Sequence, residues 1–297
     1  MHWETYNSVN GTTNNPYDFR KTPGGSSGGV GALVSSAASI FGLGNDLGGS
    51  VRIPAFMCGI FGLKPTAGIV PLDGMVPEVT IGYEMANNRL QLNRDVDFKK
   101  VKVFCMEELN ILVHEPLQIE LRQSVRNVAK YFEKTFNVDV VHINLPIAHH
   151  TFELWGAFKF GDDAPDSYGE SIQKLSHCFN DSSDETILGA ISTGKRDKLK
   201  QQICNLLGED GILLFPAFCS TAPYHKQGNF TPFNNSYPTL FNALGLPSLA
   251  CPLGLNPKDG MPLGIQVVGP AYSEGLLIAV GKELEKGFGG WTPPGNI

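Results

Sequence analysis

Residues 21–66 read KTPGGSSGGVGALVSSAASIFGLGNDLGGSVRIPAFMCGIFGLKPT, and this stretch decides the fold. It holds two glycine-rich turns, Gly24–Gly29 with Ser26 and Ser27, and Gly48–Ser50. Glycine lets the backbone turn sharply and approach a ligand closely, because it has no Cβ. Acyl transfer requires such a setting, a hydroxyl nucleophile beside backbone N–H donors. Apolar residues follow both turns, which argues against the flexible linker that Gly/Ser runs otherwise indicate.

One alternative concerns the first turn alone. Residues 24–28 also fit G-x-S-x-G, the nucleophile elbow of α/β-hydrolases. That elbow follows a strand, whereas residues 20–23 are polar and end in proline. Its downstream partners would be His225 with Asp162 or Asp163, and nothing in their surroundings marks them as catalytic. The sequence therefore disfavours this fold.

The composition is that of an ordinary globular protein. The chain has 297 residues, of which 42% are hydrophobic and 18% charged, and its net charge is −6. These values predict a sizeable core and disfavour nucleic acid as a partner, because nucleic-acid binding requires a basic face. Six cysteines without a C-x-x-C pair indicate buried thiols and no zinc site or disulfide framework. Without a long apolar run, we expect neither a secretory signal nor a membrane-spanning helix.

Short apolar runs alternate with helical periodicities along the chain, which predicts an α/β layer fold in a single domain over residues 1–297. Leu117, Leu121, Val125, Val128 and Phe132 recur at helical spacing and form one apolar stripe. We expect helices at 27–40, 117–132 and 275–286 and a mainly helical stretch at 151–208. We expect strands at 101–104, 140–145, 212–215, 248–252 and 265–268, and strands or extended turns at 41–47 and 58–63.

Three ordered blocks together resemble the amidase signature family, whose members are Ser–Ser–Lys hydrolases of carboxylic amides. The blocks are residues 21–66, the run DGILLFPA at 210–217, and a closing segment between 241 and 266. Residues 14–18 and 53–59 look most like the animal fatty-acid amide hydrolase 2 branch of that family. The resemblance implies a mixed, mostly parallel central sheet covered by helices, here incomplete at the N-terminus.

The resemblance also implies roles for individual residues. Ser50 corresponds to the nucleophile, and Ser26, after an unusual cis peptide bond, to the serine that relays a proton towards a neutral lysine. The backbone amides of Leu47, Gly48, Gly49 and Ser50 would form the oxyanion hole, and Ser27 would support the hydrogen bonds between the two serines. Asp46 and Arg52 flank the loop that carries Ser50, and we interpret them as a pair that holds this loop in shape. No cofactor and no metal are expected.

Two departures from the family pattern affect the expected activity. The family's catalytic lysine lies well upstream of the first glycine block, and Lys21 is the one lysine before Ser26 in this sequence. We therefore expect a truncated domain with exposed apolar surface and impaired turnover, in which Lys21 and Lys64 are the first substitute bases to test. After residues 75–77 the chain also lacks the Gly-Pro turn and the Arg- and Asp-bearing helix that family members usually carry.

The resemblance implies a small-molecule or lipid amide as substrate. It allows a homodimer and peripheral contact with a membrane, and the expected location is cytoplasmic or membrane-peripheral. Two other functions stay open. One is a non-catalytic remnant or interaction protein, and the other is the amidase component of a glutamine-dependent tRNA amidotransferase. The animal-type sequence at residues 53–59 argues against the latter.

Overall fold

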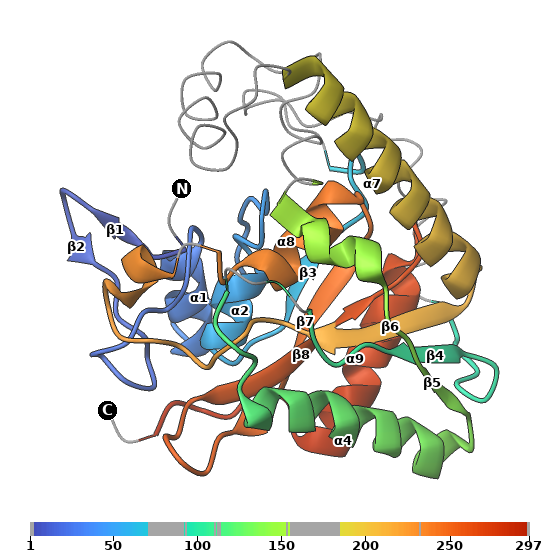
Figure 1. Ribbon diagram of the computed structural model, residues 1–297. Helices are drawn as coiled ribbons and strands as arrows, with labels where there is room; N and C mark the ends of the chain where they lie inside the picture. The colour runs from blue at the N-terminus through green and yellow to red at the C-terminus, as the bar shows by residue number, and fades with distance from the viewer. Residues whose placement is uncertain are drawn as a thin grey trace.

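A six-stranded mixed sheet forms the centre of the structure (Figure 1). The structure is a computed structural model that describes residues 3–70, 92, 94–109, 111, 114–152, 154, 185–231 and 233–295. The strand order is β3-β7-β8-β6-β4-β5. The strands are β3 (Gly62–Lys64), β4 (Lys102–Cys105), β5 (Val140–His142), β6 (Gly211–Pro216), β7 (Ser248–Leu255) and β8 (Pro262–Val268), and a separate hairpin pairs β1 (Tyr6–Asn7) with β2 (Gly11–Thr12).

The predicted α/β fold is confirmed, but parallel pairing does not predominate among the described strands. β4 pairs in parallel with β5 and β6, whereas the pairs β3–β7, β7–β8 and β6–β8 are antiparallel. For the pair β7–β8, the physical reason is the short connection at 256–261, closed by a 2.7 Å hydrogen bond from the Asn256 N–H to the Met261 carbonyl. A connection this short joins β7 and β8 as a hairpin, which is antiparallel.

Helices cover both faces of the sheet. In Figure 1, α4 (Ile119–Phe136) and α9 (Glu274–Phe288) lie below it, and α7 (Glu185–Leu207) and α8 (Ser236–Ala243) lie above it. β6 contributes to both cores, because Leu213 and Phe215 join one cluster and Ile212 and Leu214 the other. All four side chains are at most 1% exposed. Coverage on both faces explains why this strand is a continuous apolar run.

The predicted apolar stripe is confirmed in α4, where Leu121, Val125, Val128 and Phe132 are buried. α7 occupies the end of the stretch predicted to be helical, and residues 155–184 of that stretch, with Asp162 and Asp163, lie outside the described residues. Within the described part of the chain, no helix is both long and apolar enough to cross a bilayer.

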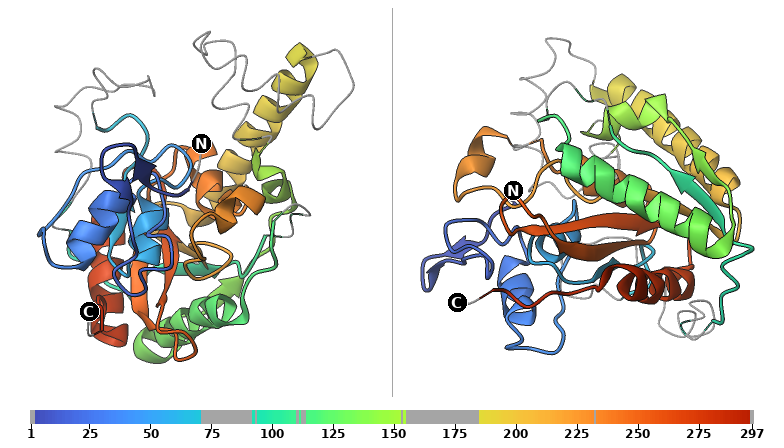
Figure 2. Two further views of the ribbon diagram at one scale, coloured as in Figure 1. Left: turned by 90° about the vertical axis from the view of Figure 1, so that its left-hand side faces the viewer. Right: turned by 90° about the horizontal axis from the view of Figure 1, so that it is seen from below.

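Two short helices carry the predicted serine turns into the core. α1 (Gly28–Ser35) begins directly after Ser27 and ends earlier than predicted, while α2 (Arg52–Met57) follows Ser50 and was not predicted. All six residues of α2 are buried. The left view of Figure 2 shows both helices on the side of the molecule where the two termini lie.

Four of the five cysteines that the structure describes are buried as predicted, whereas Cys204 is half-buried. Cys58, Cys105, Cys219 and Cys251 are buried and unpaired, whereas Cys178 lies outside the described residues. Burial raises the pKa of the Cys105 thiol to about 12. These thiols are therefore protonated at neutral pH and act as small apolar side chains.

The segment between α1 and the second serine turn exposes apolar side chains. Ile40, Phe41 and Leu43 are 98%, 74% and 86% exposed. Leu33 on α1 is 54% exposed. These exposed apolar side chains precede the turn that carries Ser50.

Candidate active site

The two serine turns lie against each other. The Ser27 N–H donates a 3.0 Å hydrogen bond to the Ser50 carbonyl, and the Gly31 N–H donates to the Ser27 carbonyl at the start of α1. Ser26 is exposed, and Ser50 and Ser27 are half-buried. The fold therefore brings the predicted nucleophile and the predicted relay serine to one place, with Ser26 open to solvent.

The turn before α1 has the predicted backbone geometry. The Gly25–Ser26 peptide bond is cis. Thr5 Oγ1 accepts a hydrogen bond from the Gly28 N–H at 3.0 Å and donates to the Gly24 carbonyl at 2.9 Å. One threonine hydroxyl thus ties the residues on both sides of Ser26 together. No motif in the sequence marks Thr5, which is why its role was not predicted.

Gly25 is the position in this turn where a side chain cannot fit. A Cβ added there would lie 2.6 Å from the Glu4 carbonyl oxygen and 2.7 Å from the Trp3 carbonyl carbon, both backbone atoms. We expect Gly25→Ala to lower the free energy of unfolding by roughly 2–3 kcal/mol, as overpacking does. Urea denaturation measures this change.

Gly29→Ala is the matched control for this prediction. Gly29 lies in α1 four residues further on, and a Cβ there meets nothing within 4 Å. Because alanine favours helices more than glycine does, this variant is expected to keep or gain stability. Equal destabilisation of the two variants would contradict the close packing of residues 3 and 4 on Gly25.

A buried ion pair organises the second serine turn. The Asp46 carboxylate accepts hydrogen bonds from the Gly49 N–H at 2.7 Å and the Arg52 N–H at 3.2 Å. It also accepts from Arg52 Nε at 2.9 Å and Nη2 at 3.0 Å. The Arg52 and Asp46 side chains are 0% and 4% exposed. The predicted pair is therefore formed, and it encloses Ser50 between its two members in the chain.

Two amides from distant segments complete this network. Arg52 Nη2 donates to Asn242 Oδ1 at 2.6 Å, and Arg52 Nη1 donates to Gln266 Oε1 at 2.8 Å. Asn242 Nδ2 in turn donates to the Asp46 carbonyl at 2.5 Å. Neither amide was assigned a role from the sequence. Their signal is a polar side chain inside each of the apolar segments 240–246 and 262–268.

The turn between Asp46 and α2 fixes which amides can face a substrate. The Gly48 carbonyl accepts a 3.0 Å hydrogen bond from Thr239 Oγ1 on α8, and the Gly49 N–H is engaged by Asp46. Among the described residues, no hydrogen bond involves the N–H of Gly48 or of Ser50. Gly49 has φ +108°, and a Cβ there would lie 2.6 Å from Pro238 Cγ, so this position requires glycine.

The environment of Asp46 lowers its pKa. Burial alone would raise the pKa of this carboxyl, but the Arg52 guanidinium and the hydrogen bonds that it donates hold the pKa well below the ordinary value. Because the folded-state pKa is depressed, the stabilisation is present above the unfolded-state pKa of about 3.9 and is lost as the pH falls below it. We expect Asp46→Asn to have a flatter stability profile between about pH 5 and pH 2, measured by denaturation at each pH. If the stability of Asp46→Asn depends on pH in the same way as that of the unchanged chain, the Asp46–Arg52 ion pair does not stabilise the fold.

Comparison with known proteins identifies the family. The sequence model of the Amidase family matches residues 1–90 and 91–278. The chain belongs to the amidase family. It is 34% identical to Fatty-acid amide hydrolase 2-A of Danio rerio and 32% identical to Fatty-acid amide hydrolase 2 of Homo sapiens. In both cases the alignment covers 100% of this chain and 66% of the relative. The chain thus spans about two thirds of the length of these relatives.

Other members of the amidase family are more distant. A Glutamyl-tRNA(Gln) amidotransferase subunit of Natranaerobius thermophilus is 26% identical over 95% of the chain and 69% of the relative. The crystal structure of the corresponding subunit from Thermotoga maritima has a TM-score of 0.74 at 20% identity and covers 99% of this chain and 74% of its own. A fatty acid amide hydrolase structure has a TM-score of 0.72 at 20% identity, over 97% of this chain and 63% of its own. The structural matches confirm the predicted amidase-signature fold.

Gaps in these alignments fall inside the chain. The alignment with the Danio rerio relative runs over 353 positions, although the chain has 297 residues. The relative therefore carries internal residues that this chain lacks. The Amidase family model also matches the chain in two separate segments, which meet between residues 90 and 91. The departure predicted after residues 75–77 falls in a segment that lies outside the described residues.

The residues of the rejected nucleophile-elbow hypothesis have other surroundings in this amidase fold. No strand lies between residues 13 and 25, all of which are described. His225 Nε2 is 3.3 Å from the Phe19 carbonyl oxygen. The two candidate substitute bases also have partners: Lys21 Nζ lies 3.2 Å from Asp259 Oδ2, and Lys64 Nζ donates to the Pro65 carbonyl at 2.7 Å.

Proposed function

We propose that this chain is the catalytic part of an amide hydrolase whose nucleophile is Ser50. The hydrogen bond from the Ser27 N–H to the Ser50 carbonyl supports this proposal most directly, because it joins the turn that precedes α1 to the turn that precedes α2. In the proposed reaction, Ser50 Oγ attacks the amide carbonyl carbon and forms an ester with the acyl group. Ser26 passes the Ser50 proton to the departing amine nitrogen. A water molecule then hydrolyses the ester and regenerates Ser50.

The backbone of the second turn would stabilise the negative oxygen of the tetrahedral intermediate. Of the predicted donors Leu47, Gly48, Gly49 and Ser50, the N–H groups of Gly48 and Ser50 fit this role best, because the Gly49 N–H already donates to Asp46. Asp46 and Arg52 would hold the turn in shape from both sides of Ser50. Preorganised donors of this kind contribute strongly to acyl transfer.

The proposed substrate is a fatty-acid amide. Full-chain identities of 32–34% with proteins named fatty-acid amide hydrolase 2 support this choice. The second candidate is glutamine, as in a tRNA amidotransferase, supported by the 26% identity with a component of such an enzyme. Release of ammonia from oleamide but not from glutamine is expected, and the opposite selectivity would favour the second candidate.

We also propose that the 297 residues form one domain and turn over slowly. The sheet collects strands from residues 62 to 268, which supports a single domain. Lys21 pairs with Asp259, and Lys64 donates to a backbone carbonyl, so both candidate bases already have structural partners. Loss of a general base lowers a rate by about 10²–10⁴-fold. A chain that folds but shows no reaction at all would instead fit the non-catalytic function.

Labelling with a fluorophosphonate tests the nucleophile without requiring turnover. We expect one label on the folded 297-residue chain, located on Ser50 by peptide mass spectrometry. Heat-denatured chain and Ser50→Ala should stay unlabelled, whereas Ser8→Ala, which removes an exposed serine in the β1–β2 turn, should label normally. Unchanged labelling of Ser50→Ala would exclude Ser50 as the nucleophile.

A further inference from the structure

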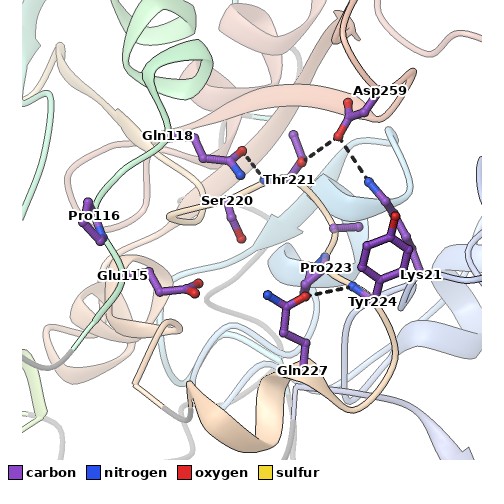
Figure 3. Close-up of a pocket in the computed structure, with 11 residues that line it drawn as sticks. Lys21, Glu115, Pro116, Gln118, Ser220, Thr221, Pro223, Tyr224, Gln227 and Asp259 are labelled. Carbon is purple, nitrogen blue, oxygen red and sulfur yellow. Dashed lines mark hydrogen bonds and ion pairs between the residues drawn. The ribbon is translucent and has the colours of Figure 1, made fainter.

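A cavity outside the serine turns is lined by residues from four segments of the chain. Its volume is about 390 Å³, and its lining contains neither Ser26 nor Ser50. The walls come from the segment before the first serine turn, the segment that leads into α4, the loop after β6 and the β7–β8 hairpin (Figure 3). Cavities of this size bind small molecules in other proteins, usually through a few placed polar groups.

On one wall of the cavity, the charged and polar side chains pair with one another. Lys21 Nζ lies 3.2 Å from Asp259 Oδ2, and Thr221 Oγ1 donates to the same oxygen at 3.2 Å. The Lys21 side chain is 9% exposed, and its ammonium lies over the Tyr224 ring. The positive charge of Lys21 is therefore neutralised by Asp259, and this wall offers little attraction to an anion.

The opposite wall carries an unbalanced negative charge. Glu115 Oε2 accepts a 2.7 Å hydrogen bond from Asn234 Nδ2, and no cation pairs with Glu115 among the described residues. In Figure 3 the Glu115 carboxylate, the Ser220 hydroxyl and the Gln227 side chain point towards the same space. Gln227 Oε1 accepts from the Tyr224 N–H at 3.3 Å, so its amide nitrogen is the end that faces Glu115.

We propose that this cavity binds a small primary ammonium compound that also carries a hydroxyl or carbonyl oxygen. The ammonium donates to Glu115, and the oxygen accepts from the Gln227 amide nitrogen and the Ser220 hydroxyl. This binding goes beyond the proposed hydrolysis and does not depend on it. The occupant would lie between segments that lead to both serine turns. Lys21 is five residues before Ser26, and Asn234 precedes Asn235, whose Nδ2 is 3.5 Å from the Gly48 carbonyl oxygen.

Calorimetric titration of the 297-residue chain with 3-amino-1-propanol tests the proposal. The titration uses the Ser50→Ala variant, so that its result is independent of hydrolysis. Propane-1,3-diol is the matched neutral compound. We expect the amine to bind about tenfold or more tightly than the diol, because a hydrogen bond to a charged group is stronger than a neutral one. Equal binding of the two compounds, or no binding of the amine, would overturn the proposal.

A charge-removing variant locates the site. Glu115→Gln keeps an acceptor for Asn234 and is expected to weaken amine binding by about tenfold or more. Glu285→Gln removes an exposed carboxylate on α9, outside the cavity, and should leave binding unchanged. If Glu115→Gln does not fold by circular dichroism, Ser220→Leu replaces it, because the larger side chain fills the cavity and leaves Glu115 in place. If the variant that folds binds the amine as tightly as the unchanged cavity does, the ammonium compound does not bind at Glu115 and the proposal is refuted.

Discussion

Amide hydrolysis by this chain is expected to fall by about 10³-fold or more when Ser50 is replaced by alanine, because loss of the nucleophile lowers the rate of a serine hydrolase by up to about 10⁶-fold. The reason is that no ester can form without the Ser50 hydroxyl. The Ser50 carbonyl keeps its hydrogen bond with the Ser27 N–H, because that bond uses only main-chain atoms. The variant should therefore fold, and its loss of activity should come from the missing hydroxyl and not from unfolding. Initial rates of product release from oleamide measure it.

Ser26→Ala separates the relay from the nucleophile. Because a water molecule partly replaces a lost hydroxyl, we expect a smaller decrease of about 10²-fold. The double variant should lose little more than Ser50→Ala alone, since residues that act as a unit are not additive. Ser8→Ala serves as the control for an exposed serine. Full activity of Ser50→Ala would remove the proposed mechanism, and full activity of Ser26→Ala would remove the relay.

Arg52→Met is the substitution with the largest expected effect on stability. Methionine fills a similar volume, but it removes the charge that pairs directly with the buried Asp46 carboxylate and the donors to Asn242 and Gln266. Breaking a buried pair in this way lowers the free energy of unfolding by about 3–5 kcal/mol. The difference is measured by urea denaturation, with circular dichroism to establish that the variant folds.

Arg20→Met is the matched control for the buried arginine. Arg20 also pairs with an aspartate, Asp18, at 2.9 Å, but its side chain is 75% exposed. Since solvated pairs contribute little, the stability of this variant should stay close to that of the unchanged chain. The double variant Asp46→Leu with Arg52→Met removes both charges and should recover part of the loss. Similar destabilisation by Arg52→Met and Arg20→Met would contradict the structural role of the buried pair.

Local patterns in the sequence predict a helix or strand when its buried and exposed faces differ, or when the residues that it contacts are close to it in the chain. The apolar stripe of α4 was predictable because its polar and buried sides alternate at helical spacing. α2 was not, because all six residues of RIPAFM are buried and leave no such alternation. The resemblance predicted that the turns of Ser26 and Ser50 act together. It could not reveal Thr5, whose hydroxyl contacts residues 19 and 23 positions away.

The same limit applies to the polar network around Arg52. Asn242 and Gln266 lie 190 and 214 positions from Arg52 in the chain. No window of sequence around Arg52 contains them, and each is one polar residue within an apolar run. Their function depends on tertiary contacts that only the folded sheet brings together. The sequence predicted the Asp46–Arg52 pair, but the two amides that complete its network had to come from the structure.

The distance along the chain between Arg52 and its amide partners has a consequence for biosynthesis. Asn242 and Gln266 leave the ribosome 190 and 214 residues after Arg52. Until then, the buried guanidinium lacks two of its acceptors. The Gly48 carbonyl likewise lacks its hydrogen bond from Thr239 until that residue of α8 is made. Contacts of such high sequence separation form late and slowly. A nascent chain that stops before residue 242 would hold both serines and the Asp46–Arg52 pair, but the network around Arg52 would still lack both amides.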